Sequence, residues 1–489
     1  MGKYAILFFG CVLFHIAGTW SLPLIDRDEP RFAEASREMI ERGEYVVPYF
    51  NNQLRLDKPP LAYWAQVVSY RIFGENDFAA RFPSVVAAAL TALVIFAWGV
   101  RIGGEKVGWW AAIIFTLALQ TFVHAKAAVA DMWLVLFVTI AHWSGFELIQ
   151  RSTRNQGTAA SKPPWAIWKS LFLVFYPALA FGFLAKGPIA WTPLLTVSAI
   201  TIYARDWRLA RRFKFLPGIL LTLAIVALWG IPALLQTDGE FFTVGIGRHV
   251  IGRSFATMEG HGANSLGMYL LLLPFYFVTI FISFLPWSIK LPWLSKNLWR
   301  RRDSIDNYLI TGVAIIFVIF SLVKTKLPHY TLPAFPLLAL LLARHWQGAG
   351  IGENRCSLFA SIAVTTTCVW LAIALAIPPM VARFFPAYQL FQVSRASLAP
   401  NMQFASLGFE EPSLVWYFRS RVKGFLTPLN NRRATEFMNA PGKRFTILPT
   451  PVAGPLFANS PQHWRFFTVS GVNVAKGKRV DLTMVLKPE

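Results

Sequence analysis

The chain has 489 residues, of which 55% are hydrophobic and 15% charged, and its mean hydropathy is +0.46. Soluble domains carry about 25% charged residues, so this composition excludes an ordinary soluble protein and indicates one that crosses a membrane many times. The net charge of +22 fits Lys and Arg retained in cytoplasmic loops and attracted to anionic membrane lipids. Nucleic acid is excluded as a partner, because no long polar basic domain is present to bind it.

Eleven apolar segments are long enough to be membrane helices, which need about 20 residues. They are residues 4–24, 79–100, 107–124, 129–149, 169–185, 188–204, 215–235, 267–289, 308–323, 331–343 and 358–377. Because proline interrupts the short segments around Lys186 and Pro328, we expect eleven to thirteen spans. We interpret the first segment as an uncleaved helix, since it lacks a convincing cleavage site.

The basic connectors predict the orientation. With the N-terminus inside, residues 101–106, 150–164, 205–214, 290–302 and 343–355 all lie in the cytoplasm. The loop at 25–78, the turns near Lys126, Lys186 and Lys324, and the tail then lie outside. The sequence therefore predicts a transmembrane domain (1–377), which includes an outer loop (25–78), and a C-terminal domain on the outer side (378–489).

Residues 25–63, IDRDEPRFAEASREMIERGEYVVPYFNNQLRLDKPPLAY, mix both signs of charge more densely than any other window. Pro30 and Gly43 bound a predicted helix with one apolar face. Residues 60–73 form a second amphipathic run. We expect both helices to lie on the outer membrane surface as a platform.

The tail alternates apolar and polar residues, which predicts strands at 414–422, 444–450, 463–471 and 480–486. The predicted fold is thus an α-helical polytopic membrane protein with amphipathic surface helices on its outer side and a small C-terminal α/β domain.

Polar residues gather at the predicted outer ends of the helices, where a shared water-lined cavity would remove the cost of placing them near lipid. They are Asp28, Glu29, Lys58, Lys126, Asp131, Lys186, Arg248, His249, Lys324, Lys326, His329 and Tyr330. Several cations with a few carboxylates suit a phosphorylated ligand. A carboxylate among cations also suits proton abstraction or orientation of an attacking group.

Each residue also has a simpler interpretation. Asp28 and Glu29 could cap the helix that follows them, and Lys58 could extend toward lipid phosphates. Asp131 could form a structural ion pair, and Lys186 and Lys324 could be interfacial anchors. Asp57 and His249 could together bind a divalent metal ion, although single histidines are usually not ligands.

Five motifs carry a resemblance to a known family. They are DEPRFAEASREM (28–39), LDKPPLAYW (56–64), AKAAVADMW (125–133), LAKGP (184–188) and KLPHYTLPAFP (326–336). With them the sequence resembles the bacterial lipid A aminoarabinose transferases, within the GT-C group that includes protein O-mannosyltransferases. The resemblance implies that Asp28 and Asp131 are catalytic. It also implies that Arg31 and Lys58 face the carrier phosphate, and Tyr330 matches the tyrosine of the KLPxY element. We add Tyr63, Lys186, Arg248, Lys324 and His329 to Tyr330 as candidate substrate-binding residues.

The implied reaction moves 4-amino-4-deoxy-L-arabinose, or another amino sugar, from undecaprenyl phosphate to lipid A at the periplasmic face of the bacterial inner membrane. A phosphate acceptor would need Asp28 only for orientation, whereas a hydroxyl acceptor would need it as a general base. Alternatives are the same fold with a protein or other glycan acceptor, or a lipid-linked sugar transporter, although no internal symmetry favours transport. We expect the other charged residues of 25–63 to lie on the platform surface.

Overall fold

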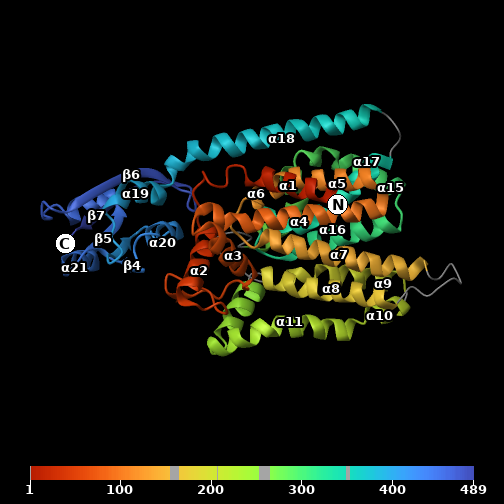
Figure 1. Cartoon of the computed structure of the whole chain (residues 1–489), viewed down its shortest axis with the longest axis horizontal. Helices are drawn as coiled ribbons and strands as arrows, with labels where there is room; N and C mark the ends of the chain where they lie inside the picture. Colours follow the sequence, from red (N-terminus) through yellow and green to blue (C-terminus); the bar gives the residue numbers. More distant parts are fainter. Residues whose placement is uncertain (1, 155–164, 206, 253–264, 349–352, 489) are drawn as a thin grey trace.

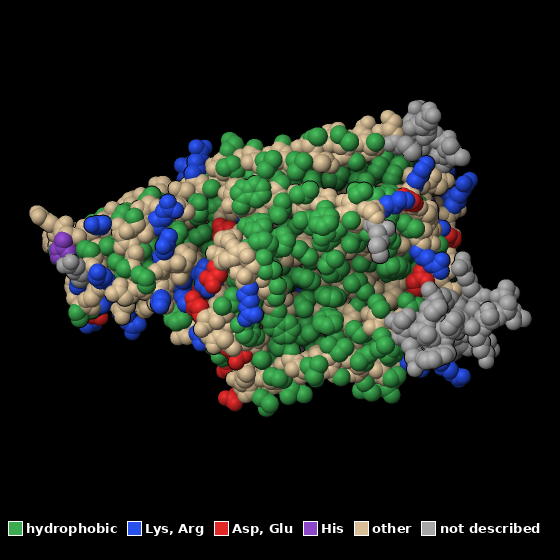
Figure 2. All heavy atoms as spheres, viewed as in Figure 1, with side chains coloured by type: hydrophobic (Ala, Val, Ile, Leu, Met, Phe, Trp, Pro, Cys, Tyr) green, Lys and Arg blue, Asp and Glu red, His purple; other side chains and the backbone are tan. Residues whose placement is uncertain are grey.

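The structure is a computed structural model that describes residues 2–154, 165–205, 207–252, 265–348 and 353–488. Figure 1 shows a long helical bundle with a small sheet-containing domain at one end, and α2 and α3 at the junction between them. Hydrophobic side chains cover the middle of the bundle on the face seen in Figure 2, while charged side chains gather toward both ends. This distribution fits a protein with lipid around its middle.

The bundle contains a helix in every predicted span. Its elements are α1 (Gly2–Ile16), α4 (Asp77–Gly103), α5 (Glu105–Leu117), α6 (Leu119–His124), α7 (Asp131–Arg154), α8 (Trp165–Lys186), η1 (Pro188–Trp191), α9 (Thr192–Tyr203), α10 (Trp207–Phe213), α11 (Phe215–Gln236), η2 (Phe241–Gly252), α13 (Leu266–Leu271), α14 (Phe275–Ser283), η3 (Trp287–Lys290), α15 (Leu291–Arg300), α16 (Ser304–Leu322), η4 (Pro328–Ala334), α17 (Phe335–Gly348) and α18 (Glu353–Val381). Within the described ranges, five helices are long and apolar enough to cross a membrane: Asp77–Gly103, Asp131–Gln150, Leu209–Gln236, Ser304–Leu322 and Ser357–Phe384. Several other predicted spans are divided into shorter helices, as at Pro286 between α14 and η3, because proline cannot donate a backbone hydrogen bond.

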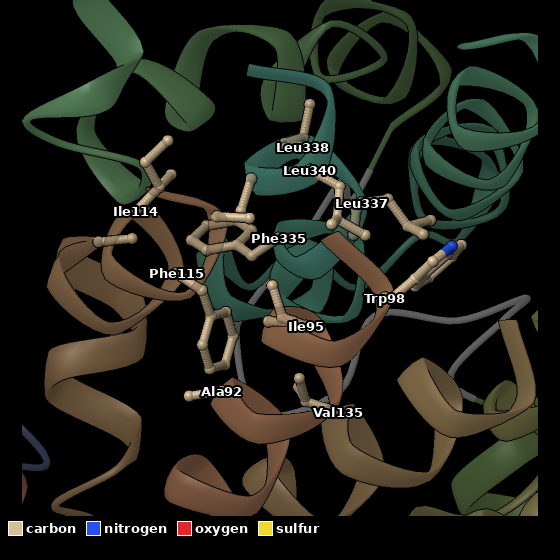
Figure 3. Close-up of a cluster of buried hydrophobic side chains, with 14 of the residues drawn as sticks. Ala92, Ile95, Trp98, Ile114, Phe115, Val135, Phe335, Leu337, Leu338 and Leu340 are labelled. Atoms are coloured by element: carbon tan, nitrogen blue, oxygen red, sulfur yellow. The ribbon is translucent and has the colours of Figure 1, made fainter. Parts of the chain in front are cut away.

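The core of the bundle lies where α4, α5, α7 and α17 meet (Figure 3). Trp98 of α4, Phe115 of α5 and Phe335 of α17 are fully buried there. Gly99 allows α4 and α5 to approach closely, since a Cβ atom at Gly99 would lie 2.6 Å from the Cα of Gly108. Small residues at a helix contact are a common solution in membranes, where apolar surface alone does not drive association.

The platform consists of α2 (Asp28–Arg42), a hairpin of β1 (Tyr49–Phe50) and β2 (Gln53–Leu54), and α3 (Leu61–Phe73). Helices form in both predicted segments, although α2 begins two residues earlier than expected. Helix α2 ends at Gly43, whose φ of 65° gives the left-handed conformation that closes many helices. The hairpin turns at Asn51 and Asn52, which also have positive φ and belong to a residue type that tolerates it.

The expectation that the remaining charged residues lie on the platform surface is wrong for much of α2. Glu34, Arg37 and Glu38 are buried, with 0%, 2% and 0% of their surface exposed. Arg419 of the C-terminal domain pairs with Glu34 and Glu38, and Arg37 Nη1 lies 2.6 Å from Glu34 Oε2. The C-terminal domain covers this face of α2, so the charges form an internal network.

The C-terminal domain contains one mixed sheet and short helices. Its elements are η5 (Ala382–Phe384), α19 (Pro386–Ser394), η6 (Arg395–Ser397), β3 (Gln403–Leu407), α20 (Pro412–Arg419), β4 (Leu426–Leu429), α21 (Asn431–Asn439), β5 (Arg444–Pro449), α22 (Thr450–Leu456), β6 (Arg465–Asn473) and β7 (Lys478–Lys487). The strand order is β4-β3-β5-β7-β6, with β3 parallel to β4 and β5, and β7 antiparallel to β5 and β6. This arrangement agrees with the predicted α/β class.

Three of the four predicted tail strands are confirmed as β5, β6 and β7, but the strand predicted at 414–422 is wrong. That segment forms α20, which begins with Pro412 in its first turn. Every residue of α20 is buried, because the helix lies between the sheet and α2. An apolar run that is buried on all sides carries no usable periodicity.

Helix α20 fastens the C-terminal domain to the start of the platform. The carboxylate of Asp26 accepts hydrogen bonds from the Ser413 backbone N–H at 2.9 Å and the Ser413 hydroxyl at 2.6 Å. Asp77, at the first turn of α4, accepts from Trp416 Nε1 at 2.7 Å and from the Tyr417 hydroxyl at 2.9 Å. These bonds fix the position of the first turn of α2, which follows Asp26.

Candidate functional site

A polar cavity of about 490 Å³ lies between the platform and the adjoining end of the bundle. Its walls come from the first turn of α2, residues 53–58, and the ends of helices that the sequence places on the outer side. The charged and titratable lining residues are Asp28, Arg31, Arg55, Asp57, Lys58, Asp131, Lys186, Glu240, His329 and Tyr330. The structure therefore joins segments that are up to about 300 positions apart in the sequence.

The neighbouring acids Asp28 and Glu29 have different environments. Asp28 is exposed and lines the cavity together with Arg31, one helical turn later. Glu29 is buried and accepts hydrogen bonds from Arg81 Nε at 2.9 Å and Arg81 Nη2 at 2.7 Å. It also accepts from the backbone N–H groups of Ile25 and Ala128. Glu29 is thus a structural residue, whereas Asp28 is available to a ligand.

Arg55 is a buried cation at the cavity wall. Its Nε donates to the hydroxyl of Tyr63 at 2.8 Å and lies 3.2 Å from Asp57 Oδ1. Burial opposes the charge on Arg55, but Tyr63 and Asp57 outweigh it and raise the pKa of Arg55 above its usual value. Arg55 therefore adds a permanent positive charge that the predicted residue set did not include.

Tyr63 does not line the cavity in the described part of the chain. Its side chain has 0% exposure and stacks on Phe32, with ring centroids 5.0 Å apart. The predicted contact between Tyr63 and substrate is corrected accordingly, because Tyr63 lies behind Arg55 and positions it.

Asp131 and Lys186 form an ion pair at the base of the cavity, with Lys186 Nζ 2.5 Å from Asp131 Oδ1. Asp131 begins α7, and Lys186 ends α8 just before Gly187, whose φ is 82°. His329 Nε2 lies 3.9 Å from the same carboxylate oxygen, and the Lys186 ammonium lies 5.7 Å from the Tyr330 ring centroid. Both His329 and Tyr330 come from η4.

The structure thus places Asp28, Arg31, Asp57, Lys58, Asp131, Lys186, His329 and Tyr330 around one cavity, and their individual roles remain predictions. Lys324 is not among the described lining residues. The side chains of Arg248 and His249 lie outside the described part of the structure, so the predicted Asp57–His249 metal pair has no described geometry. Lys126 points elsewhere, since its ammonium donates to the carbonyl groups of Phe14, His15 and Ala17 and so caps the end of α1.

His124 is a candidate metal ligand that the sequence analysis did not name. Side-chain ligand atoms of His124, Asp131 and His329 all lie within 4.8 Å of one another. His124 Nδ1 lies 3.2 Å from the carbonyl oxygen of Gln120, which leaves Nε2 as a possible ligand. Two imidazoles and a carboxylate form a common set for zinc or a similar ion, although Lys186 competes for the Asp131 carboxylate. The position of His124 at the outer end of a predicted span, seven residues before Asp131, was the available signal.

Two apolar grooves open from the polar cavity. One, of about 410 Å³, runs from Lys58, Asp131 and Lys186 past Leu134, Leu195 and other apolar residues of α7, α9 and α16. The other, of about 220 Å³, runs from Lys58 and Lys186 between α8, α11 and η2. A charged chamber continuous with apolar grooves suits a ligand that has an anionic head and a hydrocarbon chain.

Comparison with known proteins finds relatives of this chain. Three of them are each named as an undecaprenyl phosphate-α-4-amino-4-deoxy-L-arabinose arabinosyl transferase. The protein of Edwardsiella ictaluri is 30% identical over 72% of this chain, a match that spans only 60% of that protein's length. The protein of Erwinia tasmaniensis is 30% identical over 82% of this chain and 70% of its own length. That of an Enterobacter species is 27% identical over 99% of this chain and 85% of its own length.

Residues 57–231 also match the family of dolichyl-phosphate-mannose-protein mannosyltransferases. Among solved structures, ArnT from Cupriavidus metallidurans bound to undecaprenyl phosphate superposes with a TM-score of 0.78 and 18% identity, covering 98% of both chains. Its apo state gives a TM-score of 0.75 and 19% identity, covering 99% of this chain and 98% of that one. These structures establish the same GT-C fold, and the sequence matches establish that this chain belongs to the family of undecaprenyl phosphate-α-4-amino-4-deoxy-L-arabinose arabinosyl transferases.

Proposed function

We propose that the protein is a glycosyltransferase that moves 4-amino-4-deoxy-L-arabinose, or another amino sugar, from undecaprenyl phosphate to lipid A. One observation carries the proposal: the polar cavity and the apolar grooves meet at the same two lysines, Lys58 and Lys186. A polyprenyl phosphate joins an anionic group directly to a long hydrocarbon. Such a donor needs cations and an apolar groove at adjacent positions, and this site offers both.

In the proposed reaction an oxygen of the acceptor bonds to the anomeric carbon of the sugar, while the bond from that carbon to the donor phosphate oxygen breaks. Negative charge grows on the departing polyprenyl phosphate. Arg31, Lys58 and Arg55 supply fixed positive charge at the cavity where that phosphate would lie. If the acceptor is a lipid A phosphate, it is already anionic and needs no strong base. Asp28 then orients the sugar, for example by contacting the ammonium group of the amino sugar.

The Asp131–Lys186 pair would hold the base of the site in shape. Lys186 lines the polar cavity and both grooves, so its ammonium lies at the point where head group and chain of the donor separate. Pairing with Asp131 restricts that ammonium to one position, which lowers the entropy that donor binding must remove.

We place the protein in the bacterial inner membrane, with this cavity at the periplasmic face. Basic connectors at 101–106, 290–302 and 343–355 support this orientation, because they meet at the opposite end of the bundle from the cavity. Lys and Arg are retained on the cytoplasmic side of membrane proteins.

A transfer assay tests the proposal. The purified protein in liposomes would receive the undecaprenyl-phosphate-linked amino sugar and lipid A, and mass spectrometry would follow the mass of lipid A. We expect the increment of one amino sugar, and its loss in Asp28→Asn. Asp238→Asn is the matched control, since Asp238 is exposed in the same outer region but does not line the cavity. Unmodified lipid A with the wild-type protein would contradict the proposal.

A second candidate keeps the fold and donor class but uses a protein or other glycan hydroxyl as acceptor. The match of residues 57–231 to protein mannosyltransferases favours it. A hydroxyl acceptor must lose its proton during transfer. The rate of sugar transfer to it would therefore depend steeply on the ionisation of Asp28. A pH–rate profile with each acceptor separates the candidates, because a phosphate acceptor would show little dependence near the pKa of a carboxyl group.

A further inference from the structure

A second polar cavity lies at the other end of the bundle, where the connection between α4 and α5, the connection between α15 and α16, and the end of α17 meet. Its volume is about 1130 Å³, more than twice the 490 Å³ of the polar cavity beside the platform. Figure 1 shows α15 and α17 at the end of the bundle remote from the C-terminal domain. This cavity is therefore separate from the sugar-transfer site, and nothing in the proposed reaction uses it.

The acidic residues of this cavity already have partners. Arg344 pairs with Asp303, and its Nη1 lies 2.5 Å from Asp306 Oδ1. Glu105 lies 2.5 Å from the Lys3 ammonium.

Four further cations line the same cavity: Lys106, Arg300, Arg301 and Arg302. Across the side chains that the structure describes, none of these four has a carboxylate within the 4.0 Å of an ion pair. The cavity consequently carries a concentrated excess of positive charge. Three consecutive arginines can donate paired hydrogen bonds to an oxyanion.

Two buried donors on the cavity walls also lack acceptors. The side-chain nitrogens of Asn297 and Gln347 are inaccessible to water and have no hydrogen-bond partner among the described residues. Buried donors are normally paired. Both amides lie out of reach of water in the wall, so the exposed arginine side chains are the groups that a ligand in the cavity would meet. Their paired N–H donors suit an oxyanion such as a phosphate group.

Helix α15 places this cavity at the membrane interface. Leu294 is buried against the bundle, while Trp299 is 89% exposed near the end of a strongly amphipathic helix. Amphipathic helices with exposed Trp and adjacent Arg lie at the level of lipid head groups. Basic pockets between membrane helices at this level bind anionic phospholipids.

We propose that this cavity binds the phosphate group of an anionic phospholipid head group, such as that of phosphatidylglycerol. A basic loop that only sets membrane orientation needs net charge, but it does not need a large cavity lined by several cations without a carboxylate partner among the described side chains. Free phosphate has the same chemistry as the head group, so the experiment must separate the two sources.

The test measures binding to the delipidated full chain in detergent, by native mass spectrometry and by ligand-induced shifts in melting temperature. The probes are short-chain phosphatidylglycerol, short-chain phosphatidylcholine and inorganic phosphate. The cavity variant is Arg300→Gln/Arg301→Gln/Arg302→Gln. Its matched control, Arg205→Gln/Arg211→Gln/Lys214→Gln, removes three exposed charges from another basic connector.

We expect the cavity variant to bind phosphatidylglycerol at least about tenfold more weakly than wild type, and the control to stay within about twofold. Arg301→Gln alone should also weaken binding, and it serves if the triple variant does not fold. Equal losses in cavity variant and control would overturn the site, because net charge alone would then explain binding. Inorganic phosphate that binds as tightly as the lipid would overturn the head-group assignment, and phosphatidylcholine that binds equally well would overturn the requirement for an anion.

Discussion

Lys186 and Asp131 are in direct contact at 2.5 Å although 55 positions separate them in the chain. The contact arises because α7 begins and α8 ends at the same level of the bundle, with Gly187 ending α8. The pair lies where the polar cavity meets the larger apolar groove. One ion pair therefore contributes both to the packing of two helices and to the shape of the proposed donor site.

A double-mutant cycle on this pair separates the two contributions. Lys186→Met leaves the Asp131 carboxylate without its ammonium, and losing one partner of a buried pair costs about 3–5 kcal/mol, which the residual exposure here reduces to about 2 kcal/mol. Adding Asp131→Asn should recover most of the decrease in melting temperature that Lys186→Met causes. It should not restore transfer, because Lys186 is also proposed to bind the donor. Recovery of transfer in the double variant would show that the pair is purely structural.

The adjacent acids Asp28 and Glu29 give a prediction with opposite readouts. Asp28→Asn should reduce transfer by about a hundredfold, the scale of rate loss when a substrate is no longer held in the reactive orientation, with an unchanged melting temperature because the side chain is exposed. Glu29→Gln should instead lower the melting temperature, since it weakens a buried bidentate pair with Arg81. Thermal unfolding and the lipid A assay on both variants check this contrast. A destabilised Asp28→Asn variant with normal specific activity would contradict it.

The sequence predicted the bundle well because lipid imposes a minimum length on every apolar span, and proline marks where the helices break. It also placed Asp28, Lys58, Asp131 and Lys186 at the same end, since basic loops define the orientation of every connector. Three results needed the folded structure. The first is the burial of Arg37, which depends on contact with the C-terminal domain, about 380 positions later in the chain.

Tyr63 illustrates the second limit, because a tyrosine beside a conspicuous motif gives no sign of whether it faces a ligand or supports an arginine. Helix α20 illustrates the third. Its apolar run is covered by the sheet on one side and by α2 on the other, so the expected alternation of a strand and the actual helix cannot be distinguished from residue type alone.

The contact between Asp26 and Ser413 predicts a pH dependence of stability. Burial raises the pKa of Asp26 to about 6, and nearby Glu411 adds to this, although hydrogen bonds from Ser413 oppose it. A raised pKa means that the folded protein binds the proton more tightly than the unfolded chain. The free energy of unfolding should therefore fall as pH rises from about 4 to about 6, by about 1–2 kcal/mol after allowing for partial exposure.

Asp26→Asn removes this titration and supplies the reference. The melting temperature of wild type minus that of Asp26→Asn should be higher at pH 4.5 than at pH 7, where the wild type must keep a buried carboxylate ionised. A difference that does not change with pH would mean that Asp26 has similar pKa values in the folded and unfolded protein.

Metal binding gives the last prediction, and the geometry of His124, Asp131 and His329 determines its pattern. If these residues bind zinc, then inductively coupled plasma mass spectrometry after dialysis against Zn²⁺ should find about one ion per chain, the stoichiometry of a single site. His124→Asn and His329→Asn should each abolish most of this binding, whereas Asp57→Asn should not. Lys186→Met should tighten zinc binding, because its ammonium competes for the Asp131 carboxylate. Loss of zinc in Asp57→Asn alone would instead support the Asp57–His249 pair. Equal zinc content in all variants would exclude both sites, since the retained metal would then have ligands elsewhere.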